Sequence, residues 1–162
     1  MLAASNLVEI WPISLLPMCA NRRTTPHWSE DSVQHQEFRA ILAEILEDVL
    51  GCGALEEKHL LRLDVLCPKL LKAALPLIDR ELVHRFETRN SGRYFYSVVG
   101  KKAKYMCHEY YCSCPSFMYM VYYMQEDPIC KHQLGAMLSY ALGRYHMVVI
   151  EDAHFAEALL QR

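Results

Sequence analysis

The chain has 162 residues, of which 52% are hydrophobic and 22% are charged, so it holds enough apolar material for one small domain with helical additions. Its formal net charge of −2 excludes a protein that coats nucleic acid through overall basicity. No apolar run approaches the roughly 20 residues that a membrane-spanning helix requires, and we expect no contact with a membrane.

The first 28 residues contain an apolar stretch, Leu7 to Met18, that fits neither a signal peptide nor a transmembrane helix because Pro12 and Pro17 interrupt it. We expect residues 1–28 to be a disordered extension or the product of an incorrectly assigned start. The chain has seven cysteines, an odd number, which argues against a full disulfide framework. A reducing compartment, the cytosol or the nucleus, is therefore expected.

Three helices are predicted between residues 29 and 79, a stretch that we interpret as a helical partner-binding region. The first is expected from about residue 31 to 50, where apolar residues recur at helical spacing until two glycines end the pattern. The second is expected over Glu56–Leu66. The third is expected over Lys69–Leu75, because Pro76 should kink or end it.

The first two of these helices are acidic, since residues 29–67 hold nine acidic and three basic residues. Their charged face is either solvated or an acidic docking surface. Short, leucine-rich helices cannot bury their apolar sides alone. They either cover the module that follows or leave an apolar groove for another protein.

After the third helix the period of the apolar residues changes to two, which is typical of strands. Strands are expected over residues 82–87, Tyr94–Val99 and Lys104–His108, with a turn at residues 90–92 between the first two. They should form a small antiparallel hairpin or three-stranded sheet within a module that spans residues 80–145.

Basic residues cluster at the tips of this sheet. Residues 80–104 hold seven basic and two acidic residues, and Arg89 and Arg93 flank one turn while Lys101 and Lys102 lie at the other. These four are either solvated loop charges or a salt-sensitive contact for nucleic-acid phosphates.

Two pairs of metal-binding residues follow the third strand. Cys112 and Cys114 are separated by one residue and, after fifteen intervening residues, so are Cys130 and His132. Three thiolates and one imidazole are the ligand set of a closed tetrahedral zinc site. Because the protein fills all four positions, we predict one zinc ion that is structural and not catalytic.

Three residues near these pairs, Lys131, Cys107 and His108, can also affect the metal site: Lys131 through its charge, the other two as alternative ligands. Lys131 lies between two of the four residues and can offset the net negative charge of the site. Cys107 and His108 end the third strand. Either one of them replaces a ligand in a different register, or they are a core thiol and a solvated imidazole.

Residues 117–124, between the two pairs, are rich in Tyr and Met and should form a short helix. Their side chains either pack over the metal as core or stay exposed for nucleic-acid bases or a protein partner. A helix is expected over Lys131–Arg144. We interpret residues 146–162 as a C-terminal amphipathic helix, whose apolar periodicity begins after Glu151.

The sequence carries no phosphate-binding loop, no nucleophile elbow and no His-Glu-x-x-His zinc pair. One ion that binds both Cys130 and His132 would also remove the lone pairs that a thiol nucleophile and its base need. We therefore expect no catalytic residues, no small-molecule substrate and a non-enzymatic role.

The pattern Cys-x-Cys, spacer, Cys-x-His behind a hairpin resembles the SWIM zinc finger. The segment from about Leu70 to Arg144 is similar to the small single-SWIM proteins of the Shu-type recombination complex, on the residues Ala74–Arg80, Gly92–Gly100, Tyr111–Phe117 and Cys130–His132. That subfamily has Ala three residues after the His, where this chain has Gly135. A small residue is kept, so another helix can still approach closely.

The resemblance implies an α+β fold in which short N-terminal helices precede a zinc-stapled ββα finger. It also implies a nuclear adaptor that pairs with a recombinase paralogue, an ATPase-like protein, and promotes recombinase filaments on single-stranded DNA in homologous recombination repair and meiosis. DNA would be contacted through the complex. Two alternatives remain: a module that binds nucleic acid directly through the hairpin tips, and a substrate-recruiting module of the ubiquitin or transposase kind.

Overall fold

The computed structural model describes residues 31–160 of the chain, and the side chains of residues 34–160. It confirms the α+β class. The α-helices are α1 Asp31–Cys52, α2 Glu57–Leu66, α3 Pro68–Asp79, α4 Lys131–Ala141 and α5 Phe155–Leu160. The strands are β1 Val83–Thr88, β2 Tyr94–Val99, β3 Lys104–His108, β4 Tyr111–Cys112 and β5 His146–Ile150. Two shorter segments are the π-helix η2 Phe117–Tyr123 and the 3-10 helix η3 Asp152–His154.

The sequence predicted a disordered N-terminal extension and no membrane-spanning helix. The prediction of a disordered extension falls on residues 1–28, which lie outside the described residues. Within the described part of the chain, no helix is both long and apolar enough to cross a membrane.

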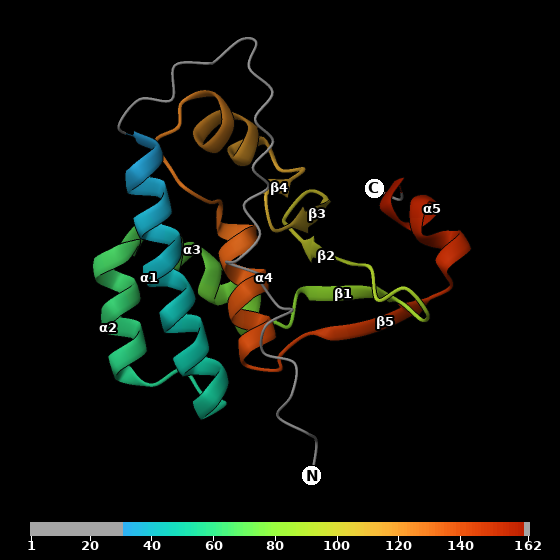
Figure 1. The fold of residues 1–162 in the computed structure, drawn as a ribbon, viewed down its shortest axis with the longest axis horizontal. Coiled ribbons are helices and arrows are strands. Elements are labelled where there is room, and N and C mark those ends of the chain that lie inside the picture. Colours follow the sequence, from blue (N-terminus) through green and yellow to red (C-terminus); the bar gives the residue numbers. More distant parts are fainter. Residues whose placement is uncertain (1–30, 161–162) are drawn as a thin grey trace.

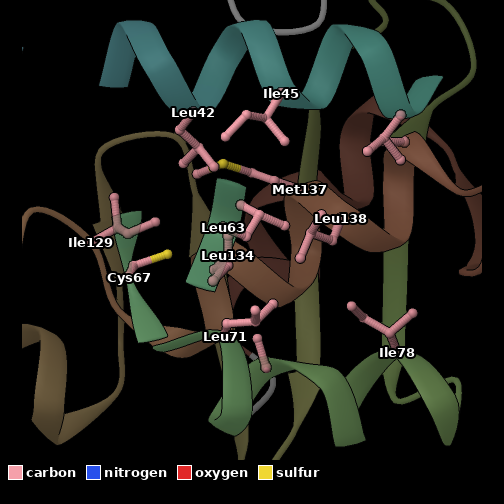
Figure 2. Packing of buried hydrophobic residues seen from close by; sticks show 13 residues of the cluster. Leu42, Ile45, Leu63, Cys67, Leu71, Ile78, Ile129, Leu134, Met137 and Leu138 are labelled. Carbon is pink, nitrogen blue, oxygen red and sulfur yellow. The ribbon is translucent and has the colours of Figure 1, made fainter. Parts of the chain in front are cut away.

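Helix α4 is the central element of the fold. Figure 1 shows α1, α2 and α3 gathered on one side of α4, and the sheet on its other side. Apolar side chains from all four helices meet in one buried cluster (Figure 2), which includes Leu42, Ile45, Leu63, Leu71, Ile78, Leu134, Met137 and Leu138. The leucine-rich N-terminal helices therefore cover the module that follows them, and their apolar faces are buried inside this chain.

Helix α3 continues past the proline that was expected to end or kink it near Leu75. Pro76 lies inside the helix, which runs to Asp79. The ring of Pro76 is exposed, whereas Leu77 and Ile78, in the same turn, are buried. Packing of these two side chains offsets the hydrogen bond that proline cannot donate.

The sheet has five strands in the order β4-β3-β2-β1-β5. The three central strands are the antiparallel ones that the sequence predicted, with Val83 paired to Val98 and Tyr96 paired to Cys107. The expected three-stranded sheet is therefore extended at both edges. The short strand β4 adds to β3 and carries Cys112 into the site.

The prediction of a single helix over residues 146–162 is wrong for its first five residues. His146–Ile150 form β5, which runs parallel to β1 with His84 paired to His146. Parallel neighbours need a long crossover, and here the crossover includes the whole metal-binding segment and α4. Sequence periodicity does not reveal such a distant partner, because β5 is short and its side chains are only half-buried or exposed.

The C-terminal segment is attached to the β1–β2 turn. The carboxylate of Asp152 accepts hydrogen bonds from the backbone N–H groups of Asn90 and Ser91, both at 3.2 Å. The ring of Phe155 packs edge-on against Phe95, with ring centroids 5.7 Å apart. These contacts hold α5 at the end of the sheet, where Figure 1 shows it.

Candidate metal centre

The four residues predicted to bind zinc come together in the structure. Cys112 ends β4, Cys114 follows it, Cys130 is the N-cap of α4 and His132 lies in the first turn of α4. All four are buried, and their ligand atoms lie within 4.8 Å of one another. The Sγ atom of Cys112 is 4.0 Å from Nδ1 of His132. In a tetrahedral site with Zn–S bonds of about 2.3 Å, ligand atoms lie about 3.8 Å apart, so this cluster fits the ion.

The electrostatics of the three thiols also favour a cation. Hydrogen bonds from Cys112 and Cys130 lower the pKa of the Cys114 thiol, and the Phe117 N–H supports it at 3.3 Å from the sulfur. The pKa values of Cys112 and Cys130 are raised, first by hydrogen bonds to neighbouring sulfurs and then by burial. Burial and the crowding of the three sulfurs thus work against three thiolates in the absence of a cation. A divalent cation would supply the charge that holds all three sulfurs as thiolates.

Gln133 ties the second ligand pair to the turn before the first pair. Its side-chain oxygen accepts the Cys130 N–H at 3.0 Å, and its Nε2 donates to the Glu109 carbonyl at 3.1 Å. The backbone N–H of Gln133 donates to the Cys130 sulfur in return. Sequence reasoning did not single out Gln133, although a glutamine three residues after an N-cap is the signal of a capping box.

Two further contacts shape the surroundings of the site. The ring of Tyr105 lies against that of His132, with centroids 4.7 Å apart. A Cβ added at Gly135 would lie 3.0 Å from Cδ1 of Leu77. The small residue at position 135 therefore allows α3 to pack closely against the metal-binding end of α4.

The two alternative ligands occupy different environments. Cys107 is buried, and its sulfur lies 3.1 Å from that of Cys112. It is not a member of the group of mutually close ligand atoms. The ring of His108 is exposed and stacks on Tyr94 at 5.6 Å. The structure thus places the His108 ring with Tyr94 on the sheet and leaves Cys107 as a thiol beside the cluster.

A second group of potential ligands, Cys52, Glu56 and His59, lies at the connection between α1 and α2, with ligand atoms within 4.8 Å of one another. The ammonium of Lys58 is 3.1 Å from the Glu56 carboxylate and 3.9 Å from the Cys52 sulfur. Because Lys58 already provides a positive charge there, this group does not fit a metal ion as well as the buried cluster does.

The four basic residues at the hairpin tips divide into two kinds. Arg89 and Arg93 are paired with the C-terminal segment, at 3.0 Å from Glu151 and 3.5 Å from Asp152 respectively. Lys101 and Lys102 are exposed and make no ion pair with any residue that the structure describes. Contact of these residues with nucleic acid stays a prediction.

The tyrosine-rich segment between the ligand pairs lies mostly on the surface. Phe117 is buried and Val121 is half-buried, and both pack beside the metal site. Tyr119, Tyr122 and Tyr123 are 61%, 63% and 70% exposed. Of the two interpretations of this segment, core packing holds for Phe117 and Val121 and exposure for the tyrosines.

The chain is similar to known zinc finger proteins from several organisms. It is 36% identical over 111 residues to the zinc finger SWIM domain-containing protein 7 homolog of Dictyostelium discoideum, a match that covers 67% of this chain and 71% of that relative. It is 30% identical over 123 residues to zinc finger SWIM domain-containing protein 7 of Homo sapiens, covering 74% of this chain and 87% of the human protein. The Mus musculus protein of that name is 31% identical over 124 residues. No protein-family model and no solved structure matches the chain.

Proposed function

Because this chain belongs to the family of zinc finger SWIM domain-containing protein 7, we propose that it is a non-enzymatic adaptor held together by one structural zinc ion. The observation that carries the proposal is the buried convergence of Cys112, Cys114, Cys130 and His132. Four protein ligands complete the tetrahedral coordination of a zinc ion, so no position remains for a water or a substrate.

The partner that we propose is a recombinase paralogue, an ATPase-like protein. Together the two proteins would promote recombinase filaments on single-stranded DNA during homologous recombination in the nucleus, in DNA-damage repair and in meiosis. Support comes from the resemblance of the SWIM segment to subunits of the Shu-type complex. The relatives are named as zinc finger SWIM domain-containing proteins.

We propose that the complex of the two proteins contacts DNA, and that this chain alone binds it weakly. The chain has a net charge of −2, and two of the four basic residues at the hairpin tips are paired with carboxylates of their own chain. Few cations therefore remain for phosphate contacts, which dominate non-specific binding to nucleic acid.

The metal part of the proposal is tested by zinc analysis of the purified full chain. We expect one zinc per chain, lost in Cys114→Ser and retained in Cys52→Ser, because Cys52 is exposed and lies outside the buried cluster. Zinc binding in small modules is coupled to folding, so Cys114→Ser should also lose near-UV circular dichroism. A fully zinc-loaded Cys114→Ser protein would contradict this ligand assignment.

The adaptor part is tested with three purified proteins: this chain, the recombinase paralogue of the same organism and the recombinase. We expect the chain to bind the paralogue and the pair to shorten the lag of recombinase assembly on a fluorescent single strand. Zinc-free chain should do neither. If the chain and the paralogue form a stable pair but the lag of recombinase assembly is unchanged, the proposed role in filament assembly is refuted. Catalytic turnover of a substrate by the isolated chain would refute the proposal that it is not an enzyme.

A further inference from the structure

Exposed hydrophobic residues gather on one part of the surface beside the metal site. Thirteen large hydrophobic residues are exposed in the described part of the chain, and seven of them lie between residues 110 and 124. Five of the seven are tyrosines, here called the tyrosine surface: Tyr110, Tyr111, Tyr119, Tyr122 and Tyr123. Single exposed apolar side chains are normal, but a cluster of this kind marks an interaction site.

The tyrosine surface is built from two segments that the metal ligands hold in place. Tyr111 directly precedes Cys112, and η2 begins three residues after Cys114. The two segments touch, since the rings of Tyr111 and Phe117 lie 5.7 Å apart. A bound metal ion would fix both segments, which would limit the entropy lost when the surface binds a partner.

The charge around this surface selects the kind of partner. Residues 109–131 include three carboxylates, those of Glu109, Glu126 and Asp127, and one cation, the half-buried Lys131 beside Asp127. The nearby guanidinium of Arg39 is already used, because it lies over the Tyr110 ring at 5.5 Å and donates to the Pro128 carbonyl at 3.2 Å. An acidic rim repels phosphates, and it also repels a second copy of the same surface.

We infer that the tyrosine surface docks a partner protein whose contact segment combines apolar side chains with lysines or arginines. This inference rests on the proposed adaptor function and names the face that performs it. It moves the partner-binding face away from residues 29–79, where most apolar side chains are buried in the core and Ile41, Leu61 and Val65 are exposed. Tyrosines would anchor the apolar side chains, and the carboxylates would pair with the flanking cations.

The first experiment compares two triple variants of the full chain. Tyr119→Ser/Tyr122→Ser/Tyr123→Ser removes the proposed anchors. Leu61→Ser/Val65→Ser/Leu160→Ser removes comparable exposed apolar side chains elsewhere, which are 61%, 88% and 79% exposed. We expect the tyrosine variant alone to bind the recombinase paralogue about tenfold or more weakly, with zinc content and thermal midpoint unchanged. Equal affinities of the two variants would overturn the inference and leave the proposed function standing.

The second experiment tests the acidic rim. Glu126→Lys should slow association with the paralogue at low salt, and the difference should shrink as salt screens the charges. Glu47→Lys, a change of the same charge on the exposed face of α1, should leave the association rate unchanged. Equal slowing by both variants would show that only net charge matters, which overturns the assignment to this rim.

The third experiment does not depend on the identity of the paralogue. A benzophenone amino acid replaces Tyr122 in the full chain or, as control, Val65, and cells that express each protein are irradiated. We expect a protein adduct at position 122 only, with the linked peptide carrying lysines or arginines among apolar residues. Adducts with a second copy, another segment of this chain or nucleic acid would overturn the inference, as would none above the control. A basic, apolar peptide from an unrelated protein would support it while refuting the proposed paralogue.

Discussion

Gln133 joins both halves of the metal site through its hydrogen bonds to the Cys130 N–H and the Glu109 carbonyl. Replacing it with Ala would leave these buried groups unpaired and free the second ligand pair to move. We expect Gln133→Ala to weaken zinc affinity by about 10- to 100-fold, as other losses of ligand-orienting partners do. Competition with a colorimetric chelator measures this, and Gln36→Ala on the exposed face of α1 is the control. An affinity equal to that of the control would show that the ligands orient themselves.

Asp152 gives the C-terminal segment a dependence on pH. Its pKa is lowered, first by the hydrogen bond from Ser91 and then by the backbone N–H groups of Asn90 and Ser91 and by Arg93. A carboxyl whose pKa is lower in the folded than in the unfolded state stabilises the fold above the unfolded value, about 3.9 for Asp. That contribution is lost as the pH falls through the lowered value.

We therefore expect the amide protons of Asn90 and Ser91 to be protected at neutral pH and to lose protection as the pH falls through the lowered pKa of Asp152. Asp152→Asn should lose it at neutral pH too, because a neutral amide accepts these hydrogen bonds more weakly. Amide exchange followed by NMR measures both, with Glu157→Gln, an exposed change in α5, as the control. Protection that persists in Asp152→Asn would show that other contacts, such as those of Glu151 and Phe155, attach this segment.

The close contact between α3 and α4 depends on glycine at position 135, which has no Cβ. Gly135→Ala gains about 1 kcal/mol of helix propensity, but its Cβ would press on Leu77 Cδ1 at 3.0 Å. In a Leu77→Ala background that obstacle is gone. We expect Gly135→Ala to be more favourable there than in the natural chain by about 1 kcal/mol, measured by urea unfolding in a double-mutant cycle. A zero coupling energy would mean that Leu77 moves aside at no cost.

The elements show how far sequence reasoning reaches. Helices α1 and α2 and strands β1 to β3 follow from local periodicity, and the metal ligands follow from residue types at a short spacing. Strand β5 and the pairs that Glu151 and Asp152 make do not, because they depend on residues about sixty positions away. The sequence also does not predict that the tyrosines of η2 are exposed, because tyrosine is common both in cores and on surfaces.

At the scale of the whole molecule, α4 couples the metal to both halves of the fold. Its first turn carries His132, and its sides contact α1 and α3 as well as β1, β2 and β3. Removing zinc should therefore loosen the helical half along with the sheet. We expect a chelator to raise amide exchange in Ile45 of α1 and in Val98 of β2 together. Continued protection of Ile45 after chelation would show that the N-terminal helices fold without the metal.

The parallel pairing of β1 with β5 also has a consequence for synthesis. A ribosome releases β1 some sixty residues before β5, so the nascent chain exposes one unpaired edge of its sheet until β5 has been synthesised. Chains truncated by a stop codon after α4 but before residue 146 would keep that edge. We expect such products to need chaperones and to be degraded quickly, even though they contain every residue of the metal site.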